Sequence, residues 1–329
     1  MNNSSSSISH RLRQRAGSFV AESFFRGIAW AGQLHPNARP HKQGVEVERD
    51  VPYADGGSRD HQLDIYRPTT SAGPWPIVFY VHGGGFRILS KDTHWLMGLA
   101  FARRGYLVVS INYRLAPRHP YPAAIADTCA AYVWLTQNAA RLGGDLSRLV
   151  VAGESAGANL VTALTLAACY PRPEPYARAV FETGVVPHAA LPACGIFQVS
   201  DVARFRRRRK LPDFLFDRLH EVEHAYLGSA EPHPEGRVDL ADPLLVLERG
   251  EPPARPLPPF FLPVGTGDIL LDDTRRLKAA LDALGVRCEA RYYPGERHAF
   301  HAFVMREAAR RCWRDSYAFL DEVMPAAQR

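Results

Sequence analysis

The chain has 329 residues, of which 46% are hydrophobic and 22% are charged, and it carries a formal net charge of +6 at pH 7. This length can bury a large core and suits one large α/β domain or two smaller ones. The positive charge is modest and no nucleic-acid-binding motif accompanies it, so the sequence argues against a nucleic acid partner.

Membrane and redox signals point to a reducing, cytoplasmic setting. No apolar run reaches the roughly 18 residues of a membrane span, and Glu22 and Arg26 interrupt the apolar part of the N-terminus. We therefore expect neither a signal peptide nor stable membrane insertion. The five cysteines are scattered and form no C-x-x-C pair, which argues against a disulfide framework and a zinc site.

The first 44 residues differ in pattern from the rest of the chain. Residues 1–7 are rich in Ser and Asn and predict disorder. Residues 8–34 place apolar side chains at near-helical spacing and predict an amphipathic helix. We assign residues 1–44 to an N-terminal cap segment.

From residue 45 onward, strand-like and helix-like segments alternate. The runs "VEVERDVPY" and "HQLDIY" predict an antiparallel pair of strands. Further strand-like runs are "PIVFYVH", "GYLVVSIN", "RLVVAG", "AVFETGVV", "PPFFLPVG" and "VRCEARYYP". Helical stretches are expected at residues 92–104, 121–142, 155–170, 272–285 and 304–323. This alternation predicts an α/β fold with a mostly parallel sheet of about eight strands and helices on both faces.

One interval interrupts the alternation. Residues 188–257 are rich in Pro and Arg, and they contain the basic run "RFRRRRK" and the predicted helix "DFLFDRLHEVEHAYLG". We assign them to a cap or lid insertion, between a first core part at 45–187 and a second at 258–329. The cap would cover the edge where open α/β sheets bind ligands. The basic run is interpreted as solvated cap surface, with contact to an acidic partner or anionic lipid as the alternative.

Ser155 is the candidate nucleophile. It lies in "GESAG", between the strand-like "RLVVA" and the helix-like "AGANLVTALTLAACY". A serine in G-x-S-x-G at a strand-to-helix turn occupies a strained position that exposes its hydroxyl, and small neighbours prevent clashes there. The same turn places the N–H of Ala156 at a helix start, which favours negative charge.

The sequence "HGGGF", residues 82–86, follows the strand-like "PIVFYV". Consecutive glycines allow the N–H groups of Gly83 and Gly84 to converge on one point. Together with Ala156 they would form an oxyanion hole for the intermediate made when Ser155 attacks a carbonyl. The alternative is an ordinary flexible glycine loop.

The base and the acid are expected later in the chain than Ser155. In folds with a G-x-S-x-G nucleophile turn, the triad residues occur in the order serine, then Asp or Glu, then His. His298 follows the turn after the last predicted strand and is favoured over His301. Asp268 follows the strand-like "PPFFLPVG" directly, whereas Asp272 and Asp273 precede a helix and have N-capping as a competing role.

The chain resembles the hormone-sensitive-lipase-like branch of the α/β-hydrolase superfamily, the bacterial carboxylesterases. The similarity covers about residues 45–320 and rests on "HGGGF", "NYRLAPRHPYPAAIAD", "GESAGANL", "GTGDILLDD" and "ERHAF". It implies an α/β-hydrolase fold with a helical cap, the triad Ser155, His298 and Asp268, and hydrolysis of short- to medium-chain carboxylic esters without a metal or organic cofactor. Arg118 stands where the family usually has Glu, which leaves the substrate choice open.

Several interpretations stay open at this stage. Phe86, Phe214 and Phe300 are candidates for a substrate pocket, with core packing as the alternative. The partner is expected to be a small-molecule ester, and a homodimer is possible. The stretch "LDIYRP" also resembles arylformamidase-like members of this fold. A non-catalytic receptor of the same fold, as the gibberellin receptors are, is disfavoured because all three triad positions have suitable residues.

Overall fold

The computed structural model describes residues 27, 32, 38–208, 210–228 and 238–324. The amphipathic helix predicted for residues 8–34 lies outside them, apart from Gly27 and Gly32, and so does the disorder predicted for residues 1–7. None of the helices in the described part of the chain combines the length and the apolar character that crossing a membrane requires.

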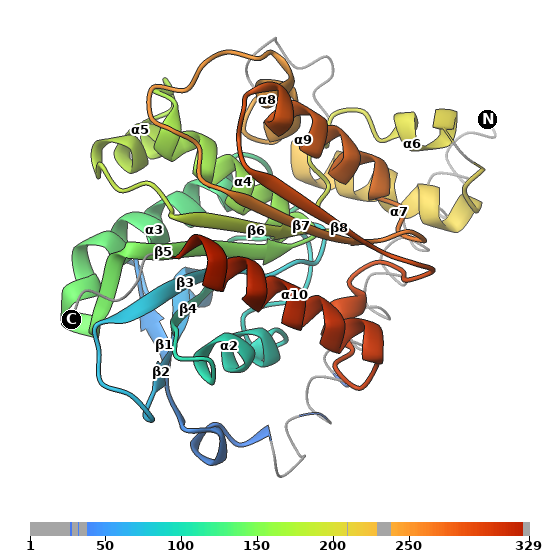
Figure 1. Ribbon diagram of the computed structural model, residues 1–329. Helices are drawn as coiled ribbons and strands as arrows, with labels where there is room; N and C mark the ends of the chain where they lie inside the picture. The colour runs from blue at the N-terminus through green and yellow to red at the C-terminus, as the bar shows by residue number, and fades with distance from the viewer. Residues whose placement is uncertain (1–26, 28–31, 33–37, 209, 229–237, 325–329) are drawn as a thin grey trace.

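The centre of the molecule is an eight-stranded sheet in the order β1-β2-β4-β3-β5-β6-β7-β8 (Figure 1). Strand β1 pairs antiparallel with β2, and β2 pairs antiparallel with β4, while all remaining neighbours are parallel. The strands are β1 Val45–Pro52, β2 Gln62–Pro68, β3 Trp75–Val81, β4 Leu107–Ile111, β5 Gly144–Glu154, β6 Ala189–Ala193, β7 Phe260–Gly265 and β8 Cys288–Tyr293. The predicted mostly parallel sheet of eight strands is confirmed.

Helices cover both faces of the sheet, and its central strands are therefore buried on both sides. Helices α3, α4 and α9 pack on one face and α2 and α10 on the other (Figure 1). The helices are α2 Trp95–Ala102, α3 Ala123–Leu142, α4 Ala156–Cys169, α5 Pro175–Glu182, α6 Ala203–Arg208, α7 Asp213–Leu227, α8 Pro243–Glu248, α9 Leu271–Ala283 and α10 Glu307–Val323. Short 3₁₀ turns occur at η2 Pro40–Gln43, η3 Arg59–His61 and η4 Phe300–Ala302.

One predicted strand is wrong. The first half of the run "AVFETGVV", residues 179–186, belongs to α5, which begins at Pro175, a residue favoured in the first turn of a helix. The sixth strand is instead β6, which lies between β5 and β7. Its sequence "AALPA" has weak strand propensity, so pairing on both sides determines its conformation. Because β6 lies within the interval 188–257, any insertion can begin only after Ala193.

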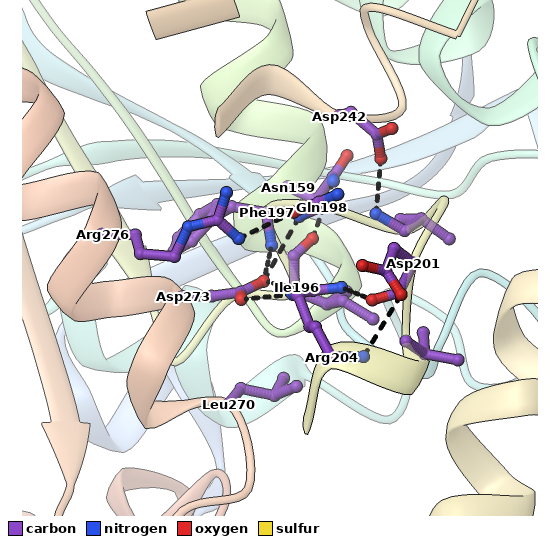
Figure 2. Close-up of polar contacts among 12 residues, drawn as sticks. Asn159, Ile196, Phe197, Gln198, Asp201, Arg204, Asp242, Leu270, Asp273 and Arg276 are labelled. Carbon is purple, nitrogen blue, oxygen red and sulfur yellow. Dashed lines mark hydrogen bonds and ion pairs between the residues drawn. The ribbon is translucent and has the colours of Figure 1, made fainter. Parts of the chain in front are cut away.

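The segment after β6 is tied to the core by three buried polar side chains (Figure 2). Asp273 of α9 accepts hydrogen bonds from the backbone N–H groups of Phe197 and Gln198, at 2.8 and 3.2 Å. It also pairs with Arg204 of α6, whose Nη2 is 2.6 Å from Oδ2. Asp242 binds the next two backbone N–H groups, and Asn159 of α4 donates to the carbonyls of Ile196 and Ala241.

The ion pair between Arg204 and Asp273 gives a first prediction. Arg204→Ala leaves a fully buried carboxylate without its counter-charge, and we expect the free energy of unfolding to fall by about 3–5 kcal/mol. Arg207→Ala is the matched control, since Arg207 pairs with Asp201 at the surface and its loss should cost about 0–1 kcal/mol. Denaturant unfolding of both variants measures the difference, and equal losses would contradict the prediction.

Helix α7 covers the loop that follows β3. The ring of Tyr226 stacks on Phe86 with centroids 3.7 Å apart and an interplanar angle of 5°. At the same surface Arg87 forms an ion pair with Glu221 of α7 at 2.9 Å. A Cβ on Gly85 would lie 2.8 Å from a methyl carbon of Val222, so the glycine allows this close approach. The predicted helix "DFLFDRLHEVEHAYLG" is therefore confirmed, and it packs on "HGGGF".

Candidate active site

Ser155 occupies the sharp turn between β5 and α4. Its backbone has φ 55° and ψ −115°, a conformation that non-glycine residues rarely adopt, so the turn is strained. The Ser155 N–H donates to the carbonyl of Ala193 at 2.9 Å, which fixes the turn against β6. A side chain at Gly157 would collide with the carbonyl oxygen of Val81. The flanking glycines therefore allow α4 to start directly against the end of β3.

The structure brings His298 and Asp268 to this serine. His298 Nε2 is 3.0 Å from the Ser155 hydroxyl oxygen. The other ring nitrogen, Nδ1, is 2.9 Å from Oδ2 and 3.1 Å from Oδ1 of Asp268. Asp268 is fully buried, while the His298 side chain is 35% exposed. The imidazole thus bridges the loops after β5 and β7 and is only partly exposed.

The charge of Asp268 controls the protonation of His298. Burial disfavours the imidazolium form, but the adjacent carboxylate outweighs this effect and raises the pKa of His298 well above its ordinary value of 6.5. An imidazole in this setting can take a proton from a neighbouring hydroxyl and hold it while Asp268 stabilises the resulting charge.

The rival candidates have other contacts. Asp273 binds the segment after β6, as described above, and Asp272 lies 3.5 Å from Arg275 on the same helix. His301 points to Glu154, with its Nε2 2.7 Å from Oε2 of that carboxylate. Among these candidates, His298 contacts the Ser155 hydroxyl and Asp268 contacts His298.

The glycine loop after β3 lies against the serine. A Cβ built on Gly83 would be 2.9 Å from the Glu154 carbonyl oxygen and 3.3 Å from the Ser155 Cβ, so any larger residue would crowd the nucleophile. Gly84 has φ 114°, and a side chain there would collide with the Ile88 carbonyl. Both positions therefore require glycine for space, and Gly84 also for its backbone conformation.

The backbone N–H groups of Gly83, Gly84 and Ala156 are the predicted oxyanion donors. None of the backbone hydrogen bonds between described residues uses Gly83 or Gly84 as the donor. Ala156 is the first residue of α4, where an N–H has no partner within the helix. Of the predicted oxyanion donors, Ala156 follows Ser155 in the chain and Gly83 packs against it, and their role stays a prediction.

His82, the first residue of "HGGGF", is buried and stabilises the glycine loop. Its Nδ1–H donates to the carbonyl oxygen of Gly83 at 2.7 Å, and its ring stacks on Tyr113 with centroids 4.3 Å apart. Burial lowers the pKa of His82 to about 3, and the neighbouring His94 contributes to this decrease. His82 is therefore neutral at pH 7 and serves to support the loop.

Glu154, the residue before Ser155, is a buried carboxylate between two histidines. Its Oε1 is 2.6 Å from Nε2 of His94 and its Oε2 is 2.7 Å from Nε2 of His301. Burial alone would raise the pKa of Glu154, but the two imidazoles outweigh it and hold the pKa well below its ordinary value. The ionised carboxylate connects the serine turn to the start of α2 and to the loop that carries His298.

This arrangement gives a second prediction. Glu154→Gln keeps the side-chain size but removes the charge, and we expect the free energy of unfolding at pH 7 to fall by about 1–3 kcal/mol. The pKa of Glu154 is depressed in the folded state, so the carboxylate stabilises the protein at pH values above 4.5, the ordinary pKa of a glutamate. This stabilisation is lost as the pH falls below 4.5. Denaturant unfolding at several pH values measures the difference in the free energy of unfolding between Glu154→Gln and the wild type. This difference should become smaller at acidic pH.

The control for this variant is Glu48→Gln, which removes a half-exposed carboxylate paired with Arg67 at the surface. Its effect should stay within about 1 kcal/mol. A loss for Glu154→Gln that is no larger than that of the control, or that does not change with pH, would contradict the prediction.

The structure does not bring the three predicted pocket residues together. Phe86 is fully buried beneath Tyr226, and Phe300 packs against Tyr293 in a separate small cluster. Phe214 is 66% exposed on α7. The rings therefore lie in three different environments, and core packing accounts for Phe86 and Phe300.

Two residues near the site were not identified from the sequence. His94 precedes α2, sixty positions before the carboxylate it binds, and no local pattern connects the two. Cys194 is the first residue after β6 and lies close to Asp268 and His298. The residue that follows β6 lies between the ends of β5 and β7, which carry Ser155 and Asp268. A correct assignment of β6 from the sequence would therefore have identified Cys194 as a neighbour of the site.

Comparison with known proteins is consistent with this geometry. A family model described as alpha/beta hydrolase fold matches residues 78–302. Carboxylesterase NlhH of Mycobacterium tuberculosis is 33% identical over 291 residues, which cover 87% of this chain and 83% of that protein. The crystal structure of esterase LipW from Mycobacterium marinum superimposes with a TM-score of 0.72 at 25% identity, covering 93% of this chain and 90% of that one. An esterase structure from the bacterial hormone-sensitive lipase family gives a TM-score of 0.71 at 23% identity, covering 92% and 91% of the two chains.

Proposed function

The chain belongs to the hormone-sensitive-lipase-like branch of the α/β-hydrolase superfamily and is a carboxylic ester hydrolase, and from this premise we propose its mechanism and substrate class. It hydrolyses short- to medium-chain carboxylic esters, with Ser155 as nucleophile, His298 as general base and Asp268 as the residue that orients the base. The observation that carries the proposal is the position of the His298 ring, 3.0 Å from the Ser155 hydroxyl oxygen and 2.9 Å from the Asp268 carboxylate.

Acylation begins when the Ser155 oxygen attacks the ester carbonyl carbon. His298 Nε2 takes the hydroxyl proton, and the Asp268 carboxylate stabilises the imidazolium. The carbonyl oxygen becomes an oxyanion, which the N–H groups of Gly83, Gly84 and Ala156 bind. His298 then gives its proton to the leaving alcohol as the carbon–oxygen bond breaks, and the acyl group remains on Ser155.

Deacylation repeats these steps with water. His298 takes a proton from the attacking water, the same N–H groups bind the second oxyanion, and His298 returns the proton to the Ser155 oxygen. The carboxylic acid leaves and the hydroxyl is restored. Preorganised donors aimed at the oxyanion supply the largest part of the stabilisation, about 3 kcal/mol for each donor.

The preference for small esters is supported by the contacts of α7 and by the similarity to a carboxylesterase. Stacking of Tyr226 on Phe86 and the ion pair between Arg87 and Glu221 hold α7 against the glycine loop, and we infer that this packing leaves little room near Ser155 for a long acyl chain. The cysteines support a cytoplasmic setting, since all five are free thiols.

A series of p-nitrophenyl esters tests the substrate class. We expect kcat/KM to be highest between acetyl and hexanoyl and to fall for longer chains, because the longer acyl groups cannot be covered beneath α7. A maximum at decanoyl or beyond would overturn the proposed class. Formylkynurenine serves as the comparison for the arylformamidase alternative, which predicts faster cleavage of the formamide than of the butyrate ester.

A further inference from the structure

Cys194 lies close to the imidazole that joins Ser155 to Asp268. Strand β6 is the neighbour of both β5 and β7, so the residue that follows it lies between the serine loop and the aspartate loop. The Cys194 N–H donates to the carbonyl of Pro263 in β7 at 3.1 Å, and the preceding residue, Ala193, accepts from the N–H of Ser155 at 2.9 Å. These hydrogen bonds hold the backbone at Cys194 between the serine turn and β7.

Three different ligand types meet at this point. The sulfur of Cys194, a carboxylate oxygen of Asp268 and a ring nitrogen of His298 all lie within 4.8 Å of one another. In the proposed reaction the carboxylate and the imidazole act as a pair, and the thiol has no part. We propose that Cys194, Asp268 and His298 form an inhibitory binding site for a thiophilic divalent cation, with Zn²⁺ as the expected ligand.

The donor set decides which cation binds. One thiolate, one imidazole and one carboxylate match the preferences of Zn²⁺, whereas Mg²⁺ and Ca²⁺ prefer oxygen ligands alone. Ligand atoms around a tetrahedral zinc lie about 3.5 Å apart, so a separation of up to 4.8 Å closes with small side-chain rotations. A water molecule or the Ser155 hydroxyl would take the fourth position.

Access to the site is through His298. Cys194 and Asp268 are buried, but the His298 side chain is 35% exposed, so a cation reaches the site from the opening used by the substrate. Burial raises the pKa of the Cys194 thiol, and the thiol is therefore protonated in the metal-free protein. Binding of Zn²⁺ displaces the thiol proton and the proton on the ligating ring nitrogen, and both protons pass to solvent.

Occupation of this site removes the base from the reaction. A metal-bound His298 cannot take the Ser155 proton while Asp268 is engaged as a ligand, so ester hydrolysis stops until the metal dissociates. This inhibitory consequence rests on the proposed triad, whereas the binding of the metal does not.

The test compares Cys194→Ala with Cys288→Ala. Cys288 is also a free thiol, but it begins β8 and lies at the opposite end of the strands from the serine turn. Co²⁺ is the spectroscopic probe, since a bound thiolate gives a charge-transfer band in the near ultraviolet. Zn²⁺ inhibition of p-nitrophenyl butyrate hydrolysis is measured in parallel, with each protein compared with its own metal-free rate and with Mg²⁺ as the control cation.

We expect the wild type and Cys288→Ala to show the Co²⁺ band and to be inhibited by Zn²⁺, with activity restored by EDTA. In Cys194→Ala the band should disappear and the inhibition constant should rise at least about 10–100-fold, since loss of a ligand costs no less than loss of its supporting hydrogen bond. Equal inhibition of the wild type and Cys194→Ala, or a wild type without the band, would overturn the proposal. If the proposed triad were wrong, the band would persist without inhibition, so the two failures are distinguishable.

Discussion

Ser155→Ala is expected to reduce kcat for p-nitrophenyl butyrate by a factor on the order of a million, the loss typical of a serine hydrolase without its nucleophile. The alanine cannot form the acyl-enzyme, and the Asp268–His298 pair then has no hydroxyl to activate. The N–H groups of Gly83, Gly84 and Ala156 remain, so a residual acceleration over water of about 10³–10⁴ should persist.

Turnover, covalent labelling and folding should be measured on the same preparations. A fluorophosphonate should modify the wild type at Ser155 and leave Ser155→Ala unlabelled, as mass spectrometry of the peptides would show. Ser316→Ala is the matched control, because Ser316 is a buried serine in α10 that donates to the Cys312 carbonyl and does not contact the triad. Turnover in Ser155→Ala within tenfold of that of the control would refute the nucleophile assignment.

The nucleophile turn could be predicted because its causes are local. Gly153 and Gly157 are needed where β5, β3 and α4 meet, and this requirement appears in the sequence as fixed spacing around Ser155. The "HGGGF" loop is similar, since the positive φ of Gly84 and the crowding at Gly83 both require glycine. The chain order of the fold then directed the search for the acid and the base.

Strand β6 could not be predicted because its cause is not local. Four of its five residues are alanine or proline, and the segment forms a strand because β5 and β7 pair with it on both sides. The run at residues 179–186 has the stronger strand composition, yet Pro175 begins a helix there and Gly184 follows it with φ 71°. Tertiary pairing outweighed strand propensity in β6, whereas a helix start and a glycine stop outweighed it in residues 179–186.

The surroundings of the site depend on the same kind of distant contact. Glu154 binds two histidines next to the serine turn, but neither partner, His94 or His301, could be identified from spacing. The aromatic residues could not be sorted from the sequence, because Phe86 and Phe300 are buried and Phe214 is exposed through tertiary packing that their local sequences do not show. Pocket residues depend on how α7 packs, which local patterns do not encode.

Asp268→Asn should lower kcat about 10⁴-fold, because the amide favours the wrong tautomer of His298 for proton transfer. The variant should also change the pH dependence. His298 acts as a base only when it is neutral, so kcat/KM falls as the pH drops through its pKa. Asp268 raises that pKa well above 6.5 in the wild type, and its neutralisation should move the acid limb of the profile to lower pH.

Asp273→Asn is the control that separates catalysis from folding. Asp273 is an equally buried carboxylate five positions later, but it binds Arg204 and the segment after β6 instead of His298. Its neutralisation should lower the free energy of unfolding and leave the acid limb of kcat/KM in place. If the limb moved equally in both variants, or stayed unchanged in Asp268→Asn, His298 would not be the base whose protonation Asp268 controls.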